Sequence, residues 1–328
     1  MTPARTVFFG SGAFATRILD AVVAAPELDL VAVVTTPDRP AGRRGEATPT
    51  PVAAAARAAG LSLLQPERLR EPGTIALIEG LAPVVGVLAD YGRIVPPAIL
   101  AAFPRGIVNV HPSLLPRHRG AAPIPAAILA GDPVLGVSLI ELVDRLDAGP
   151  VIAATSWRAA GDERARSLEE LMARAGAALL REHVGPWLAG ERRARPQDEA
   201  EATLTRPLRR EDGRLDPARA AVELERQVRA LEGWPGTFLV SDGLRIAVLE
   251  ARVVASADHD APGRPAGSDA PRPGTLLDLE GGLGLATGEG VLALTRVQPA
   301  GGRPMTGAEL LRGRPGLAGA TIESPIGA

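Results

Sequence analysis

Cysteine is absent from the 328 residues of the sequence, and so is lysine, because all 36 basic residues are arginines. Without cysteine the chain can form no disulfide framework, no thiolate nucleophile and no cysteine-based zinc site. Without lysine, Schiff-base and other lysine-dependent chemistry is excluded. Aromatic residues make up only 3% of the chain, so the core must be built from alanine, valine, leucine and isoleucine.

Long apolar runs and a strong net charge are missing as well. The sequence has no stretch of about 20 apolar residues and no signal-peptide pattern at its start, so we expect a cytoplasmic protein without membrane segments. The net charge of -2 argues against a general nucleic-acid coat but permits a local basic face. With 46% hydrophobic residues, a chain of this length has room for two domains.

The most informative stretch is Ile107–Pro123, which reads IVNVHPSLLPRHRGAAP. Two valines alternate with Asn109 and His111, and this period predicts a strand with an amide and an imidazole on one face. Pro112 ends the strand because it has no backbone N–H. Ligands of open α/β sheets bind beyond the carboxyl ends of the strands, so Asn109 and His111 are candidate site residues. The alternative for these two residues alone is a strand end with two satisfied polar groups.

The first 190 residues alternate between apolar runs and helical patterns, which predicts a doubly wound, Rossmann-like α/β domain. Expected strands are Thr6–Phe9, Leu30–Val34, Leu61–Leu64, Val84–Leu88, Gly136–Val143 and Pro150–Thr155. One expected helix follows the first strand and ends at Ala25, and two more span Val52–Gly60 and Ser167–Leu188.

One motif in this part leaves a different enzyme class open. Gly10, Gly12 and Ala15 fit the dinucleotide fingerprint GxGxxA, as a NAD-dependent oxidoreductase would. The acidic residue that should end the second strand is displaced to Asp38, in a proline-rich turn. The fingerprint is therefore weak.

The rest of the chain has a different pattern. Residues 191–205 are rich in arginine and predict a linker, and residues 206–315 hold short apolar runs separated by turns, as in a small β-barrel. Residues 255–274, dense in proline, aspartate and glycine, predict a disordered barrel loop, and 316–328 a tail.

The segment Asn-Val-His-Pro-Ser-Leu-Leu-Pro, followed by Arg-Gly-Ala-Ala-Pro-Ile, resembles the signature of enzymes that use 10-formyltetrahydrofolate. Within them the chain is most similar to the methionyl-tRNA formyltransferases. Further similar segments extend along most of the chain: Pro37–Val52, Ala89–Pro96, Leu146–Gly149, Glu211–Asp216, Trp234–Thr237 and Val297–Gly307. The resemblance implies a Rossmann-like formyltransferase domain followed by an OB-like domain that binds tRNA.

The resemblance also implies roles for particular residues. Catalysis would fall to Asn109, His111 and Asp147. Arginines of a loop would contact tRNA, with a solvated surface loop as the alternative, and one tyrosine would line the folate pocket unless it only packs in the core. The expected folate-binding residues are Ser113, Leu114, Leu115, Pro116 and Tyr91, and the expected tRNA-binding residues are Arg39, Arg43 and Arg44.

The expected reaction transfers a formyl group from 10-formyltetrahydrofolate to the free amino group of methionyl-initiator tRNA, the step that prepares this tRNA for translation initiation. Such acyl transfer requires an oxyanion donor and a proton relay, but no metal and no covalent enzyme intermediate. A monomer would suffice. The alternatives are formylation of an amino sugar or a glycinamide nucleotide, and an RNA-binding protein with an inert catalytic domain.

Overall fold

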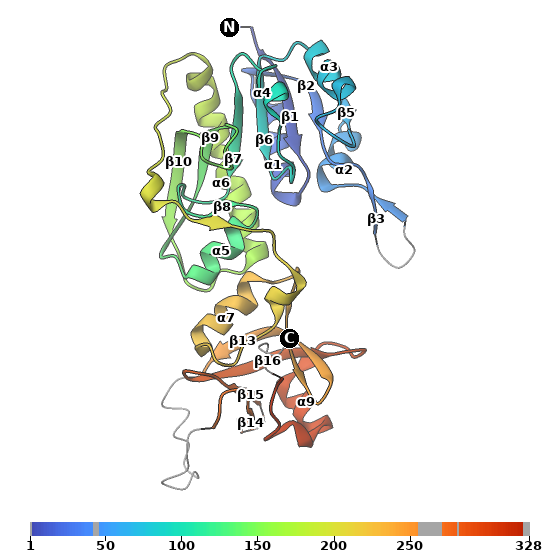
Figure 1. Cartoon of the computed structure of the whole chain (residues 1–328), viewed down its shortest axis with the longest axis vertical. Helices are drawn as coiled ribbons and strands as arrows, with labels where there is room; N and C mark the ends of the chain where they lie inside the picture. Colours follow the sequence, from blue (N-terminus) through green and yellow to red (C-terminus); the bar gives the residue numbers. More distant parts are fainter. Residues whose placement is uncertain (1, 42–45, 255–270, 281, 324–328) are drawn as a thin grey trace. The chain divides into compact units, whose positions relative to one another are not determined.

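The structure is a computed structural model, and it describes residues 2–41, 46–254, 271–280 and 282–323. The chain divides into two compact units (Figure 1). The first comprises Met1–Ile124, Pro133–Ala159 and Ser167–Arg206, and the second Pro125–Asp132, Ala160–Arg166 and Pro207–Ala328. Residues 191–205, predicted as a linker, fall within the first unit. The predicted domain boundaries themselves stay a prediction.

The first unit is organised around a seven-stranded sheet with the strand order β10-β9-β7-β6-β1-β2-β5. The five strands from β7 to β5 run parallel, while β9 is antiparallel to β7 and β10 is antiparallel to β9. The strands are β1 (Ala4–Gly10), β2 (Leu28–Val34), β5 (Leu63–Leu64), β6 (Val85–Ala89), β7 (Ile107–His111), β9 (Val134–Glu141) and β10 (Val151–Arg158).

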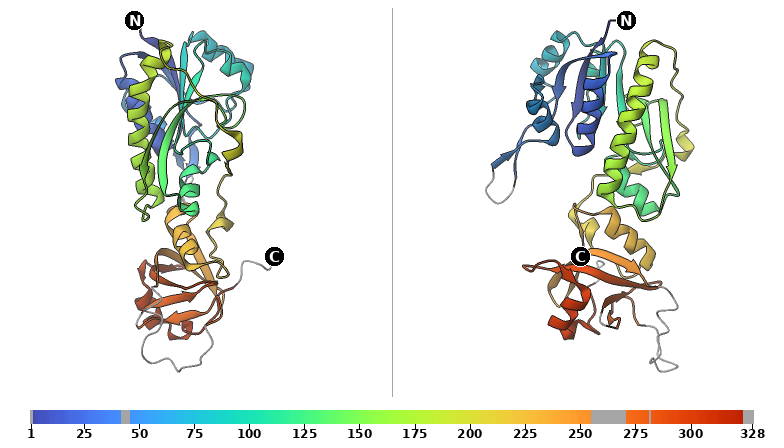
Figure 2. Two further views of the ribbon diagram at one scale, coloured as in Figure 1. Left: turned by 90° about the vertical axis from the view of Figure 1, so that its left-hand side faces the viewer. Right: turned by 180° about the vertical axis from the view of Figure 1, so that it is seen from behind.

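Helices cover both faces of this sheet (Figure 2). On one face α6 packs closely, because a Cβ on its Gly176 would meet side-chain atoms of Val110, Ile18 and Val137. On the other face Phe9, Tyr91 and Ile99 belong to one apolar core. The helices are α1 (Ala13–Ala24), α2 (Pro51–Ala58), α3 (Pro72–Gly80), α4 (Pro97–Leu100), α5 (Pro123–Ala130) and α6 (Ala165–Leu188). Most of α5 and the first two residues of α6 are assigned to the second unit, because that unit includes residues 125–132 and 160–166.

Two small paired segments complete the first unit. β8 (Arg119–Gly120) and β11 (Leu204–Thr205) form a parallel pair, although 85 residues separate them in the chain. β3 (Arg39–Ala41) and β4 (Glu46–Thr48) form an antiparallel pair. The β8–β11 pair places the segment before the second unit directly beside the loop that follows β7.

The second unit contains a curled antiparallel sheet with the order β12-β13-β16-β15-β14, and β17 pairs with β16. Its apolar core joins the sheet to α7 and α9 through residues such as Leu224, Ile246 and Leu310. The elements are α7 (Ala221–Ala230), β12 (Thr237–Ser241), β13 (Leu244–Val253), β14 (Leu276–Asp278), β15 (Leu283–Ala286), β16 (Val291–Pro299), β17 (Met305–Thr306) and α9 (Gly307–Gly313), with short 3-10 helices at Arg210–Gly213 and Pro315–Leu317. A further 3-10 helix, Glu199–Glu201, belongs to the first unit.

The predicted fold class is confirmed: a doubly wound α/β unit is followed by a small curled β unit. The predicted loop at residues 255–274 lies largely outside the described residues, which resume at 271. Among the described residues, no helix has the length and apolar character that would be needed to cross a membrane.

Candidate active site

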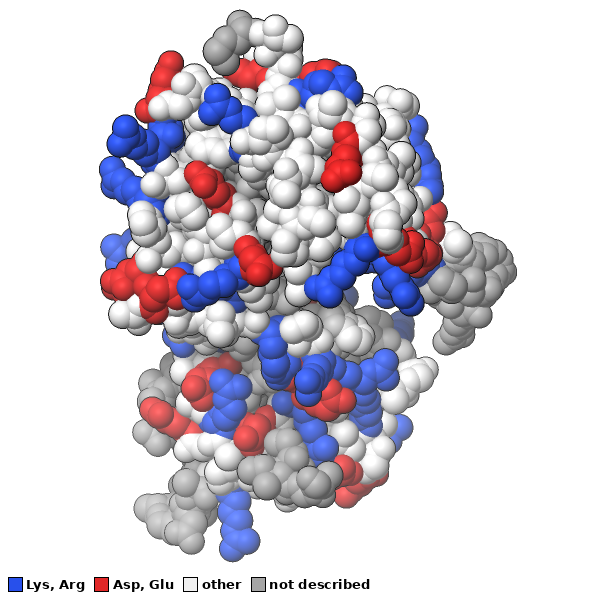
Figure 3. All heavy atoms as spheres, turned by 45° about the horizontal axis from the view of Figure 1, so that its top comes forward, with Lys and Arg blue, Asp and Glu red and all other residues white. Residues whose placement is uncertain are grey.

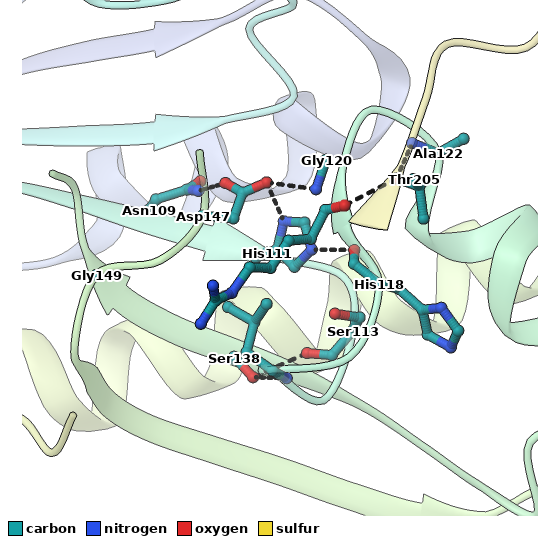
Figure 4. A network of polar contacts seen from close by, with 12 residues as sticks. Asn109, His111, Ser113, His118, Gly120, Ala122, Ser138, Asp147, Gly149 and Thr205 are labelled. Atoms are coloured by element: carbon teal, nitrogen blue, oxygen red, sulfur yellow. Dashed lines mark hydrogen bonds and ion pairs between the residues drawn. The ribbon is translucent and has the colours of Figure 1, made fainter. Parts of the chain in front are cut away.

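Asn109, His111 and Asp147 come together at the carboxyl end of β7 (Figure 4). The Asn109 Nδ2 donates a hydrogen bond to Asp147 Oδ1 over 3.1 Å, and His111 Nδ1 lies 3.6 Å from Asp147 Oδ2. All three residues are buried, with exposed fractions of 4%, 4% and 8%. The sheet thus brings together Asn109 and Asp147, which are 38 residues apart in the sequence.

The His111 ring is held by a main-chain carbonyl on its other side. Its Nε2 lies 3.0 Å from His118 O, and since a carbonyl only accepts, Nε2 carries the proton and donates it. His118 adopts φ +60°, and its carbonyl points at the ring (Figure 4). Burial lowers the pKa of His111, against the opposing effects of the Asp147 carboxylate and the His118 carbonyl. The ring is therefore neutral at pH 7, with Nδ1 as its free acceptor.

The carboxylate of Asp147 accepts two hydrogen bonds beside a tight turn. In addition to the bond from Asn109, the Gly120 N–H donates to Asp147 Oδ2 over 2.8 Å. Asp147 itself has φ +48°. Gly149 follows two residues later, where a Cβ would lie 1.7 Å from Glu141 O, so no larger residue fits. The Leu-Asp-Ala-Gly turn, residues 146–149, thus places the carboxylate beside the end of β7.

The predicted folate-binding residues Ser113, Leu114, Leu115 and Pro116 form the loop directly after β7. Ser138 of β9, which pairs with His111 in register, organises this loop: its hydroxyl donates to Ser113 O over 2.8 Å and accepts from Leu115 N over 3.1 Å. The Ser113 hydroxyl donates to Arg117 O over 2.7 Å. The sequence did not single out Ser138, because a lone serine in an apolar strand carries no distinctive signal.

Tyr91, also predicted to line the folate pocket, follows β6. Its ring is 1% exposed and packs edge-on against Phe9, with ring centroids 5.7 Å apart and an interplanar angle of 72°. Its carbonyl accepts a hydrogen bond from Ser11 Oγ over 3.1 Å. The side chain thus lies in the core beneath the loop, and its contact with folate stays a prediction.

Asp90, just before it, is the first residue after β6 and lies beside the loop that follows β1. Its carbonyl accepts hydrogen bonds from Ser11 N and Gly12 N, and a Cβ on Gly12 would lie 1.7 Å from Asp90 Oδ2. The Asp90 carboxyl group thus occupies the space that a side chain at position 12 would take. Although Asp90 is an exposed residue, desolvation of its carboxyl group by the surrounding chain, with a contribution from Glu169, raises its pKa to about 7.

Of the predicted tRNA-binding residues, Arg39 is exposed at the start of β3. Arg43 and Arg44 lie outside the described residues. Arg145, two residues from Asp147, forms an ion pair with Glu199, with Arg145 Nη2 2.8 Å from Glu199 Oε2. In the part of the chain that the structure describes, no group of three or more histidine, aspartate or glutamate side chains is arranged to hold a metal ion.

The comparisons with known proteins agree with this architecture. Residues 4–184 match the formyl transferase family, and residues 207–315 match the formyl transferase C-terminal domain. Among solved structures, the fold is similar to an N-formyltransferase from Helicobacter canadensis, in a complex with folinic acid and dTDP-3-aminofucose (TM-score 0.61, 13% identity, 89% of this chain and 99% of that chain). The protein is thus an enzyme of the formyltransferase class.

Aquifex aeolicus HypX in complex with tetrahydrofolic acid shares the fold too (TM-score 0.60, 16% identity), with 95% of this chain covering 47% of that chain. Curated relatives are far more similar. The methionyl-tRNA formyltransferase of Roseiflexus castenholzii is 43% identical over 94% of this chain and 96% of its own length, and that of Halorhodospira halophila is 44% identical over 95% and 96%. The chain belongs to the methionyl-tRNA formyltransferase family, and the NAD-dependent alternative is wrong.

Proposed function

We propose that the chain transfers the formyl group of 10-formyltetrahydrofolate to the free amino group of methionyl-initiator tRNA in the cytoplasm, acting as a monomer and without a metal. The observation that carries the proposal is the buried Asn109–His111–Asp147 cluster in a chain related over nearly its whole length to methionyl-tRNA formyltransferases. Formyl transfer needs a donor for the oxyanion, a group that accepts the amine proton and a route for that proton to the leaving nitrogen.

Asn109 supplies the oxyanion donor in this proposal. One of its two amide hydrogens is engaged by Asp147 Oδ1, which fixes the orientation of the amide. The second is free to bind the oxygen that becomes negative when the amine attacks the formyl carbon. A donor held in place before the reaction stabilises developing charge without reorganisation, and loss of one such donor typically costs about 100- to 1,000-fold in rate.

His111 and Asp147 move the proton. With Nε2 bound to the His118 carbonyl, the neutral imidazole offers Nδ1 as base, and once protonated Nδ1 is faced by Asp147 Oδ2. The proton leaves the attacking nitrogen as the new C–N bond forms, and it returns to the folate nitrogen as the old C–N bond breaks. The lowered pKa of His111 supports the role of relay over that of a permanent cation.

The co-substrate would lie along the Ser113–Pro116 loop and the Asp90–Pro96 loop. Exposed apolar side chains, which suit a flat aromatic ligand, are Ile94 of the second loop (69%) and Val143 and Leu146 of the segment before Asp147 (38% and 59%). Tyr91 would act through the shape of its loop, because its ring is in the core.

The tRNA would be held by arginines, with Arg39, Arg43 and Arg44 as the proposed contacts of the first unit. Guanidinium groups bind phosphates well because they offer a planar fork of donors. On the face drawn in Figure 3, arginine side chains gather in several groups with carboxylates among them. A binding surface on that face would thus combine local clusters, not one continuous field.

The test is a transfer assay with labelled 10-formyltetrahydrofolate and charged initiator tRNA, run beside elongator methionyl-tRNA, glycinamide ribonucleotide and an amino-sugar nucleotide. Formylmethionyl product on the initiator tRNA is expected. Activity on a small amine alone would overturn the tRNA proposal while keeping the chemistry of the cluster.

A His111→Ala variant tests the relay. We expect kcat to fall by about 100-fold or more while tRNA binding stays within about twofold, because a group used in the transition state is lost. A comparable loss in tRNA binding would contradict the proposed role.

A further inference from the structure

The segment between Arg195 and Thr205, predicted as a linker, lies against both loops that shape the site. Arg195 and Val151 exchange two backbone hydrogen bonds of 2.7 and 2.8 Å. Thr203 Oγ1 accepts from His118 N over 2.8 Å. Thr205 Oγ1 accepts from Ala122 N over 3.1 Å and pairs with the loop through β11 (Figure 4). These contacts hold the loop whose carbonyl binds His111.

Gln197 makes the corresponding contacts on the other loop. Its Nε2 donates to Asp147 O over 2.8 Å and to Gly149 O over 2.7 Å. Its Oε1 accepts from Arg119 Nε over 2.9 Å. Both amide hydrogens are therefore used on the main chain around Asp147, and the amide orientation is fixed by Arg119.

The turn at Asp147 needs such support. Asp147 has a positive φ, in the left-handed region of the backbone dihedral angles, and this conformation costs a non-glycine residue roughly 1 kcal/mol or more. Inside the turn, Ala148 N donates to Arg145 O over a long 3.3 Å. Leu146 is 59% exposed and adds little packing. The two bonds from Gln197 are shorter and bracket Asp147 on both sides.

Charges around Gln197 are arranged to keep it in place. Arg119, whose side chain is 3% exposed, binds Glu199 through both terminal nitrogens, at 3.2 and 3.0 Å. Arg145 binds the same carboxylate. Hydrogen bonds from Arg119 and Arg145 lower the pKa of Glu199 to about 2, so this carboxylate is charged throughout the physiological range. Arg145 is thereby engaged away from Asp147.

We infer that Gln197 is a positioning residue for the transfer reaction: it holds the main chain on both sides of Asp147 so that Oδ1 stays on Asn109 and Oδ2 faces His111. Its kinetic consequence rests on the proposed function, but its effect on the turn does not. Misplacement of a reacting group by about 1 Å can cost on the order of 100-fold in rate, so loosening this turn should be felt mainly in turnover.

The test uses two variants of the full chain and a matched control. Gln197→Leu removes the donors and the acceptor, while Gln197→Glu keeps an acceptor for Arg119 and loses only the donors to Asp147 and Gly149. Gln227→Leu is the control, because Gln227 also donates to two carbonyls, Asp212 O and Arg214 O, and accepts from an arginine, in the second unit.

For both Gln197 variants we expect kcat to fall by about 10- to 100-fold, with KM for folate and tRNA within about threefold. Backbone hydrogen exchange across residues 142–150 should rise in the same variants. Gln227→Leu should lose stability but change neither kcat nor exchange in 142–150. If Gln197→Leu does not fold, the Gln197→Glu variant decides.

Unchanged kcat together with unchanged exchange in 142–150 would overturn the inference. So would an equal loss of kcat in the Gln227→Leu control, which would mark a general stability effect. If the wild-type chain forms no formylmethionyl-tRNA, the proposed function fails. The exchange measurement would then still decide whether Gln197 holds the Asp147 turn.

Discussion

Tyr91→Phe should stabilise the first unit. The Tyr91 hydroxyl is buried and has no hydrogen-bond partner among the described residues. A polar group left in this state costs about 1–3 kcal/mol. Phenylalanine keeps the ring and its edge-on contacts with Phe9 and the core, so removal of the hydroxyl should recover about 1–2 kcal/mol. In a unit of this size that corresponds to a rise in Tm of about 2–8 °C.

The assay has two parts, one for stability and one for ionisation of the tyrosine. The second is unambiguous because Tyr91 is the only tyrosine of the chain. Urea denaturation, followed by circular dichroism, compares the free energies of unfolding of the two proteins. Absorbance of the tyrosinate reports ionisation directly: burial raises the pKa of Tyr91 to about 12, whereas the unfolded chain should ionise near pH 10. The native protein should therefore show no tyrosinate at pH 10.

Either of two results would refute this reasoning. A loss of stability in Tyr91→Phe would mean that the hydroxyl has a partner, such as a buried water, whose bond is worth keeping. Ionisation of the native tyrosine near pH 10 would mean that the ring is not shielded. A fall in kcat/KM at unchanged stability would instead assign the hydroxyl to folate binding, as the family resemblance suggests.

Two further predictions concern charge. Because the folded pKa of Asp90 lies above the unfolded value of 3.8, its ionisation destabilises the fold progressively between about pH 4 and 7. Asp90→Asn should thus gain on the order of 1 kcal/mol at pH 8, a value reduced for the exposure of the residue, and nothing near pH 4; equal urea midpoints at pH 8 would contradict this. Changing Arg43 and Arg44 to alanine together should weaken tRNA binding and reduce its salt slope by about 1–2. The paired change of Arg17 and Arg174 is the charge-matched control, and an unchanged slope in the Arg43/Arg44 variant would move the contact elsewhere.

The end of β7 was readable in the sequence for a physical reason. Alternation of valines with Asn109 and His111 fixes both side chains on one face, and Pro112 fixes where the strand stops. Asp147 could be found only by resemblance, because an Asp-x-Gly turn alone is typical of many hairpins. Its place beside His111 depends on the pairing of β7 with β9, and a buried apolar run does not reveal whether its strand is parallel or antiparallel.

Residues 191–205 show what the pattern could not reveal. Gln197 and Thr205 contribute hydrogen bonds to main-chain groups up to 86 residues away, and such contacts leave no hydrophobic period in the sequence. With no hydrophobic period and many arginines, these residues were therefore predicted to be a linker. α5 was missed because prolines at positions 123 and 125 suggest a turn, although proline is well tolerated in the first turn of a helix.

Because the first unit runs through Arg206, severing the chain after residue 190 would not yield an intact half. Such a fragment would leave the guanidinium of Arg119, 3% exposed in the whole chain, without its carboxylate, and the main chain at Asp147 without its amide donor. A stranded buried cation is among the costliest defects a fold can carry. A cut after Arg206 would instead keep both of these contacts within one piece. Because of the same hydrogen bonds, we expect residues 195–205 to resist proteolysis in the intact chain.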